Sequence, residues 1–196
     1  MDDPLHDLLN ELAEFGRSND AENTDRSRRM LNITPDTGEF LELLVRATAS
    51  KRVLEIGTSN GYSTVWLAKA IRATGGHVTT LEFSEYKIGL ARANFERAGL
   101  SPLISLVHTD AGAFINQPAL GPFDFIFLDS ERTEYLCWWP RLKTMVRVGG
   151  LLVVDNAMSH PGEMKDFMSV VRGDTSFLTS LVPVGNGEFL ALRVGS

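Results

Sequence analysis

The stretch Val53-Leu54-Glu55-Ile56-Gly57-Thr58-Ser59-Asn60-Gly61-Tyr62-Ser63 decides the fold of this chain. A short apolar run turns through two glycines four positions apart and enters a helical pattern. Glycine at both positions would let the backbone turn tightly and let a ligand approach closely. The spacing Glu-x-Gly-x-x-x-Gly differs from the G-x-G-x-x-G of dinucleotide folds and from the phosphate loop G-x-x-x-x-G-K-[ST]. The turn therefore predicts a strand, a ligand-binding loop and a helix, without a bound pyrophosphate.

A second acidic residue ends the next apolar pattern, which runs from His77 to Glu82. In doubly wound folds an acidic residue at this place binds ribose hydroxyls. Together with Glu55, and in the absence of a lysine in the turn, Glu82 favours S-adenosylmethionine over NAD or ATP. The alternatives are a glycine turn that serves packing alone and a solvated glutamate at a strand end.

Apolar strand patterns alternate with helical patterns along most of the chain, which is typical of a parallel sheet covered on both faces. Gly185-Asn186-Gly187 between the last two strand patterns indicates a hairpin. We therefore predict an α/β, Rossmann-like, doubly wound, mostly parallel seven-stranded sheet with a C-terminal antiparallel edge hairpin and helices on both faces. The expected strands are 53–56, 78–82, 104–108, 123–128, 151–154, 177–184 and 189–194, and the expected helices between them are 63–71, 84–98, 111–116 and 135–145.

The N-terminal region has its own pattern. Apolar residues at helical spacing from Leu5 to Phe15 predict an amphipathic helix, and another begins near Thr34. The polar segment 16–29 between them is expected to be irregular and mobile, with its arginine cluster on a solvated face. We treat 1–196 as one domain, in which 1–50 form a helical lid or oligomerisation segment and 51–196 the cofactor-binding core.

The composition restricts the partners. The 196 residues are 43% hydrophobic and 22% charged, as in soluble globular proteins, and the net charge of -6 argues against a nucleic-acid partner. No run approaches the roughly 18 apolar residues that span a bilayer, and the acidic N-terminus does not resemble a signal peptide. We therefore expect a cytoplasmic protein with no membrane partner. The single cysteine, Cys137, excludes an intramolecular disulfide and is expected to be buried.

Oxygen ligands follow two further strand patterns. Asp129 ends one pattern, and Asp155-Asn156 end the next. If the two strands are neighbours, two carboxylates and an amide converge on a set that suits Mg²⁺ or another divalent cation. The alternative is that these residues only cap the helices that follow them.

Together these motifs resemble the class I S-adenosylmethionine-dependent O-methyltransferases of the catechol and caffeoyl-CoA type. The resemblance covers nearly the whole chain and includes the segments 33–41 and 182–187. It implies a homodimer and a metal bound by Asp129, Asp155 and Asn156. It also implies a cofactor site. Glu82 would bind the ribose, Asp110 and Ala111 would lie beside the adenine, and Asp129 would lie near the cofactor. The residues expected around the methionine part are Ile33, Glu55, Gly57, Thr58, Ser59, Gly61 and Ser63.

Arg132 departs from the family pattern, which has a lysine three residues after the first metal aspartate. Arginine stays protonated and cannot act as the base, although it can stabilise a phenolate or bind a substrate carboxylate. Deprotonation would fall to the metal, to Glu131 or to His160. The catalytic candidates are therefore Asp129, Glu131 and Arg132, while His160 has the alternative reading of a surface histidine. The stretch after Asn156 is also shorter than in many relatives, so we expect a missing or reshaped substrate loop.

The expected activity is methyl transfer from S-adenosylmethionine to a hydroxyl of a small aromatic vicinal diol, assisted by a divalent metal. Three alternatives stay open. The first is a metal-independent methyltransferase of the same fold, with Arg132 binding a carboxylated or phosphorylated acceptor. The second is a cofactor-binding protein without activity, and the third is a dinucleotide oxidoreductase.

Overall fold

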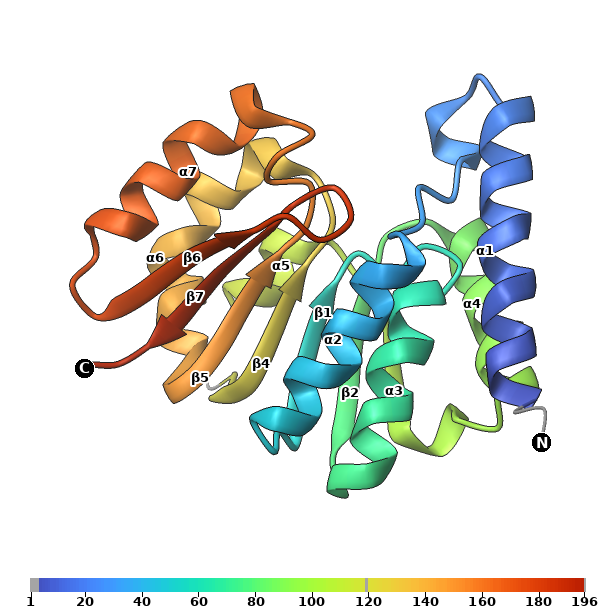
Figure 1. Cartoon of the computed structure of the whole chain (residues 1–196), viewed down its shortest axis with the longest axis horizontal. Coiled ribbons are helices and arrows are strands. Elements are labelled where there is room, and N and C mark those ends of the chain that lie inside the picture. The colour runs from blue at the N-terminus through green and yellow to red at the C-terminus, as the bar shows by residue number, and fades with distance from the viewer. Residues whose placement is uncertain (1–3, 119, 196) are drawn as a thin grey trace.

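A seven-stranded sheet runs through the molecule, in the order β3-β2-β1-β4-β5-β7-β6 (Figure 1). The computed structural model describes residues 4–118 and 120–195. The first five strands are parallel, and the last two form an antiparallel hairpin at one edge. The strands are β1 (Arg52–Ile56), β2 (His77–Glu82), β3 (Ile104–His108), β4 (Phe123–Leu128), β5 (Val146–Val154), β6 (Phe177–Val182) and β7 (Glu188–Arg193).

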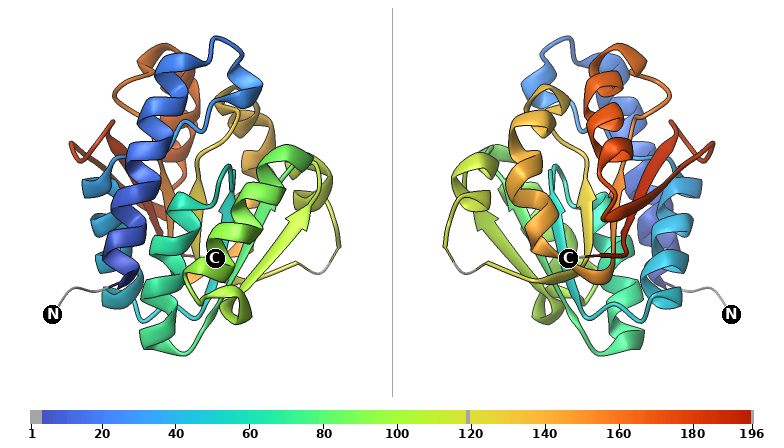
Figure 2. Two further views of the ribbon diagram at one scale, coloured as in Figure 1. Left: turned by 90° about the vertical axis from the view of Figure 1, so that its right-hand side faces the viewer. Right: turned by 90° about the vertical axis from the view of Figure 1, so that its left-hand side faces the viewer.

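Helices cover both faces of the sheet (Figures 1 and 2), because side chains along each central strand alternate between two apolar clusters. Val53 of β1 packs into the first cluster, whereas Leu54 and Ile56 pack into the second. The predicted doubly wound fold with its edge hairpin is confirmed. One face carries α1 (Pro4–Glu22), α2 (Pro35–Ala47), α3 (Tyr62–Thr74) and α4 (Glu85–Arg97), and the other carries α5 (Ala111–Ile115), α6 (Tyr135–Met145) and α7 (Pro161–Gly173).

The segment after Phe15 differs from its prediction, because α1 continues to Glu22. Tertiary contacts stabilise this polar last part of the helix. The Asp20 carboxylate accepts hydrogen bonds from the backbone amides of Met30 and Leu31, at 2.6 and 2.7 Å. Such contacts with a later segment cannot be read from helical periodicity.

Helix α7 was not predicted and occupies the stretch where a shortened substrate loop was expected. Pro161 opens the helix, and Met164, Phe167 and Val171 are buried at helical spacing. Strand β5 also begins at Val146, five residues before the predicted start. The prediction for Cys137 is wrong, because the residue is exposed. No helix in the ranges 4–118 and 120–195 is long and apolar enough to cross a membrane.

Candidate functional site

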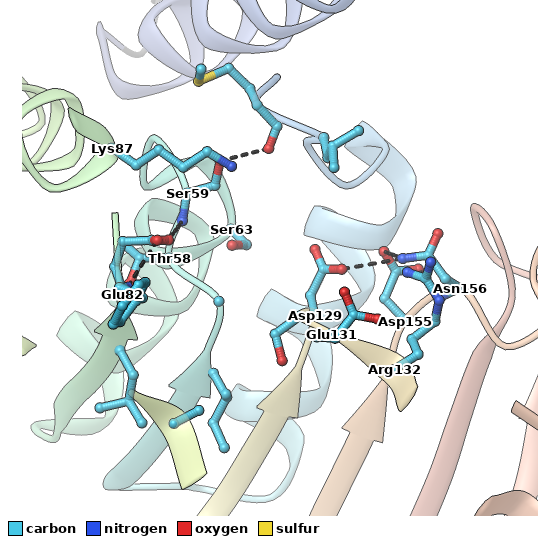
Figure 3. A pocket seen from close by; sticks show the side chains of 18 of the residues that line it. Thr58, Ser59, Ser63, Glu82, Lys87, Asp129, Glu131, Arg132, Asp155 and Asn156 are labelled. Carbon is cyan, nitrogen blue, oxygen red and sulfur yellow. Dashed lines mark hydrogen bonds between the residues drawn. The ribbon is translucent and has the colours of Figure 1, made fainter. Parts of the chain in front are cut away.

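A cavity of about 1100 Å³ opens at the carboxyl ends of the parallel strands, where the order of the sheet reverses between β1 and β4. This is the place where ligands bind in open α/β sheets. The volume lies at the upper end of the range for small-molecule sites, which leaves room for two ligands together. Figure 3 shows side chains that line it.

The two glycines of the β1–α3 turn are required by packing. Gly57 has φ +108°, and a Cβ there would lie 2.0 Å from the backbone carbonyl oxygen of Asp129. Gly61 has φ +87°, and its Cβ would lie 2.5 Å from the ring of Phe95. Gly57 borders the cavity, but Gly61 does not. The close approach that these glycines permit is between parts of the chain, and a contact between Gly61 and the cofactor stays a prediction.

Glu55 lies beneath the cavity and does not line it. Its carboxyl group is fully buried and accepts hydrogen bonds from the hydroxyls of Ser63 at 2.6 Å, Thr80 at 2.5 Å and Thr64. Burial raises its pKa to about 7, against the lowering effect of these hydroxyls. The structure therefore corrects the placement of Glu55: it ties α3 to β2, and no part of it reaches the cavity.

Glu82 lies at the end of β2 with its carboxylate held by backbone amides. Oε2 accepts from Ser59 N at 2.8 Å, and Oε1 accepts from Phe83 N at 3.0 Å and from Ser84 N at 2.8 Å. These bonds fix the carboxylate against the glycine turn at the wall of the cavity (Figure 3). Oε1 uses both of its lone pairs in these bonds, whereas Oε2 keeps one that can accept from a ligand hydroxyl.

Asp129, Asp155 and Asn156 meet at the opposite side of the cavity, after β4 and β5 (Figure 3). Asn156 has φ +65° and donates from Nδ2 to Asp129 Oδ1 at 3.2 Å and to Asp155 Oδ2 at 3.0 Å. Burial raises the pKa of both carboxyl groups, and the charge of Asp155 raises that of Asp129 further. Two carboxylates that lie close together and are shielded from water repel each other, and this favours the binding of a cation between them.

A divalent metal is compatible with this set. The described ranges contain no group of three or more His, Cys, Asp or Glu side chains placed to hold a metal. However, Mg²⁺ is commonly bound by one or two carboxylates, with water and substrate oxygens at the remaining positions. Asp129 and Asp155 would supply the carboxylates. Asn156 would supply an amide oxygen after its side-chain amide turns over, because its Nδ2 faces the two carboxylates here and its Oδ1 accepts from the Ser159 hydroxyl at 3.2 Å.

Arg132 faces the two aspartates but is paired with a residue that sequence reasoning missed. Its side chain is 9% exposed and donates from Nε to Glu163 Oε2 at 2.7 Å. The guanidinium charge also opposes the rise in pKa of Asp129 and Asp155. Glu163 lies on the unpredicted helix α7, so the sequence offered no signal for this ion pair.

Glu188 is a second residue that sequence reasoning missed. It is fully buried next to Asp155, and its Oε1 accepts a hydrogen bond from the Thr37 hydroxyl at 3.1 Å. Burial, followed by the charge of Asp155, raises its pKa well above the usual range of a glutamate, which favours the protonated form. The only sequence feature that could have identified Glu188 is its place as a carboxylate at the start of an apolar strand pattern.

The segment between α1 and α2 lies over the cavity. Ser59 Oγ donates to the carbonyl oxygen of Met30 at 2.6 Å and so ties the segment to the glycine turn. Arg26 and Arg29 line the cavity. Arg26 is exposed, as expected for a solvated face, whereas Arg29 is half-buried, which differs from that expectation. Arg28 instead lies over the ring of Tyr86, 4.6 Å from its centroid.

Most of the predicted site residues border this one cavity. Glu55 and Gly61 do not. Trp138 borders it, whereas Tyr135 and Trp139 are in the core. Lys87 borders it without having been predicted, and burial lowers its pKa. The predicted residues that line the cavity are Ile33, Gly57, Thr58, Ser59, Ser63, Glu82, Asp110, Ala111, Asp129, Glu131, Arg132, Asp155, Asn156 and His160.

Comparisons with known proteins agree on one family. The family model described as O-methyltransferase matches residues 2–194. A catechol O-methyltransferase of Niastella koreensis is 35% identical over 80% of this chain and 67% of its own length. A catechol O-methyltransferase of Mycobacterium tuberculosis is 38% identical over 66% of this chain and 59% of its own length.

A solved structure extends the likeness to the whole chain. The O-methyltransferase TomG of Streptomyces achromogenes, in complex with S-adenosylmethionine, is 26% identical with a TM-score of 0.80. The alignment covers 100% of this chain and 92% of TomG.

Proposed function

This chain belongs to the O-methyltransferase family, and on that premise we propose that it transfers the methyl group of S-adenosylmethionine to a hydroxyl of a small aromatic vicinal diol, assisted by a divalent metal such as Mg²⁺. One observation carries the proposal. A single cavity joins an amide-held carboxylate, Glu82, to two buried carboxylates that favour a cation, Asp129 and Asp155. We call the side around Glu82 the cofactor end and the side around Asp129 the acceptor end.

The cofactor end supports S-adenosylmethionine. Oε2 of Glu82 offers a free lone pair for a ribose hydroxyl, and Ser63 and Ile33 line the same cavity. Asp110, which caps α5 by accepting from Ala113 N at 2.8 Å, lines the same cavity and would lie beside the adenine. TomG was solved with this cofactor, and an O-methyltransferase of Bacillus cereus with a TM-score of 0.79 was solved with S-adenosylhomocysteine.

At the acceptor end, Asp129, Asp155 and Asn156 would hold the metal and Arg132 would lie beside the reacting oxygen. S-adenosylmethionine supplies the methyl group, and a divalent cation supplies Lewis acidity toward a diol hydroxyl. Arg132 stabilises the ionised oxygen without accepting its proton. Glu131, exposed at the cavity wall, accepts that proton, and the protein otherwise contributes position and electrostatics.

Methyl transfer to catechol and caffeate, followed by mass spectrometry, tests the proposal. We expect a singly methylated product in Mg²⁺, with loss of product in Asp155→Ala and in the presence of a chelator. Asp174→Ala is a matched control, because Asp174 pairs with Lys143 on the outer helices at 3.0 Å. Full activity of Asp155→Ala in chelator would overturn the role of the metal.

A metal-independent transfer is the second candidate. Arg132 favours it, because its charge already faces Asp129 and Asp155 from a nearly buried position. In that case the wild-type enzyme would keep its full rate in chelator, and Arg132→Met would lose it. A homodimer and a cytoplasmic location remain predictions, which a sedimentation measurement and localisation of the tagged chain would check.

A further inference from the structure

Arg29 brings an unsatisfied cationic group to the cavity. The residue lines the cavity and is half-buried, and its Nε is shielded from solvent without a hydrogen-bond partner. Within the described part of the chain, no ion pair or aromatic ring engages its guanidinium. A buried donor without an acceptor is unfavourable, and more so when it is charged. A ligand with an acceptor for this group would recover that energy.

The backbone beside Arg29 is anchored from both sides. The Asp20 carboxylate accepts from the amides of Met30 and Leu31, at 2.6 and 2.7 Å. Ser59 Oγ donates to the carbonyl oxygen of Met30 at 2.6 Å. The position of Arg29 over the cavity is therefore set by specific contacts with α1 and with the glycine turn.

Among the other cations of this region, Arg132 and Arg28 are engaged, whereas Lys87 and Arg26 line the cavity with weaker contacts. Arg132 pairs with Glu163 at 2.7 Å, and Arg28 lies over Tyr86 outside the cavity. Lys87 faces Glu82, whose charge opposes the lowering of its pKa. Arg26 lines the cavity one helical turn from Arg29, and its contact with Glu131 is a distant 4.0 Å.

The contact with Glu131 places Arg26 toward the acceptor end, since Glu131 follows Asp129 by two residues, and Arg29 lies one turn further along the segment, between Arg26 and the tie from Met30 to the glycine turn. The planar guanidinium matches the two oxygens of a carboxylate and binds them with paired hydrogen bonds. Building on the proposed function, we propose that Arg29, with Arg26 beside it, binds an oxyanionic substituent of the methyl acceptor. The substrate class is then an anionic catechol, such as one with a carboxylate side chain, in preference to a neutral one.

The test compares caffeate with its neutral methyl ester, which keeps the diol and the ring. We expect the wild-type enzyme to favour caffeate in kcat/KM by about tenfold or more, as charge-assisted hydrogen bonds imply. Arg29→Met should remove this preference and leave the rate on the ester unchanged. Arg28→Met is the matched control, because it removes the same charge from the same segment outside the cavity, and it should keep the preference.

Binding decides the inference separately from catalysis. Calorimetry on the protein saturated with S-adenosylhomocysteine gives the Kd of caffeate and of the ester for each variant, and thermal unfolding checks that each variant is folded. Arg26→Met should lose part of the preference, because its side chain is more exposed. If Arg29→Met loses the preference for caffeate over the ester in Kd, the proposal is supported even when no diol is methylated. The absence of methylation would count against the proposed function alone.

Two results would overturn the inference. One is an equal Kd for caffeate and ester in the wild-type protein. The other is an unchanged preference in Arg29→Met together with weakened binding of S-adenosylhomocysteine, which would assign Arg29 to the carboxylate of the cofactor.

Discussion

The cofactor end and the acceptor end of the cavity are built in different ways. The cofactor end is formed largely by one turn, from Gly57 to Ser63, and by Glu82 on the neighbouring strand. Backbone amides hold its carboxylate. The acceptor end brings together the ends of β4 and β5, helix α7 and the segment before α2, which lie far apart in the sequence.

The difference shows two ways of placing charge. At the cofactor end, local backbone geometry orients the Glu82 carboxylate, which accepts three hydrogen bonds from backbone amides. At the acceptor end, Asp129 and Asp155 are buried with raised pKa values, and the nearby Arg132 is shared with Glu163. The carboxylate of the cofactor end is thus already oriented for a ligand. The acceptor end instead holds two buried carboxyl groups close together, and a bound cation would balance their charge.

The largest expected effect is at the glycine turn. Gly57→Ala would place a methyl group 2.0 Å from the Asp129 carbonyl oxygen at φ +108°. We expect it to lower the free energy of unfolding by about 4 kcal/mol and to abolish S-adenosylhomocysteine binding, measured by urea unfolding and calorimetry. Gly75→Ala is the control, because Gly75 also has a positive φ but open space around it. Equal losses in the two variants would refute the role of the close contact.

Next in size is the pH dependence that arises from Glu55. Its pKa is raised from 4.5 to about 7 in the folded protein. Its neutral form therefore favours folding below pH 4.5, and that contribution is lost as the pH rises through 7. From pH 5 to pH 8 the wild-type protein should lose up to about 3 kcal/mol relative to Glu55→Gln. Urea unfolding of both proteins across this range would show parallel curves if Glu55 were ionised throughout.

At the acceptor end, Asp155→Asn should lower the methyl-transfer rate on the order of 100-fold, because it removes one carboxylate of the proposed cation site. S-adenosylhomocysteine affinity should stay within about threefold of the wild-type value, a change of less than 1 kcal/mol. Steady-state kinetics and calorimetry together measure the contrast. An equal loss of rate and cofactor affinity would mean that the two ends are not separable.

The smallest expected effect concerns the hydrogen bond that ties the segment over the cavity to the glycine turn. Ser59→Ala removes the 2.6 Å hydrogen bond to the carbonyl oxygen of Met30. Losing about 1 kcal/mol there should speed amide hydrogen exchange in residues 26–33 about fivefold. Ser27→Ala provides a control on the same segment, since the contact is made by Ser59 and Met30 without the Ser27 side chain. Unchanged exchange would show that Asp20 alone anchors the segment.

The sheet and the strand ends could be predicted because they depend on local patterns. Apolar runs ended by Glu82, Asp129 and Asp155 identify strands whose carboxyl ends meet at one edge. The cavity lies there, and most of the predicted residues line it. The roles assigned to those residues stay predictions until binding and kinetics are measured.

The remaining features depend on contacts between distant segments. Glu55 is buried because Thr80 from the next strand and Ser63 from the helix close over it, so its place in the motif did not reveal its depth. Arg29 was assigned to a solvated face because only the fold of α1 brings its segment over the cavity. Glu163 lies on a helix that was not predicted.

The central claim is that the cofactor end binds its ligand without help, whereas the acceptor end requires a bound cation. Calorimetric titration with S-adenosylhomocysteine tests this claim most directly. The titration is made with and without Mg²⁺ and a catechol such as caffeate. We expect binding in every condition, tightened about tenfold when Mg²⁺ and the diol are both present. Binding that is indifferent to both would contradict the metal-assisted acceptor end, and absence of binding would contradict the cofactor end as well.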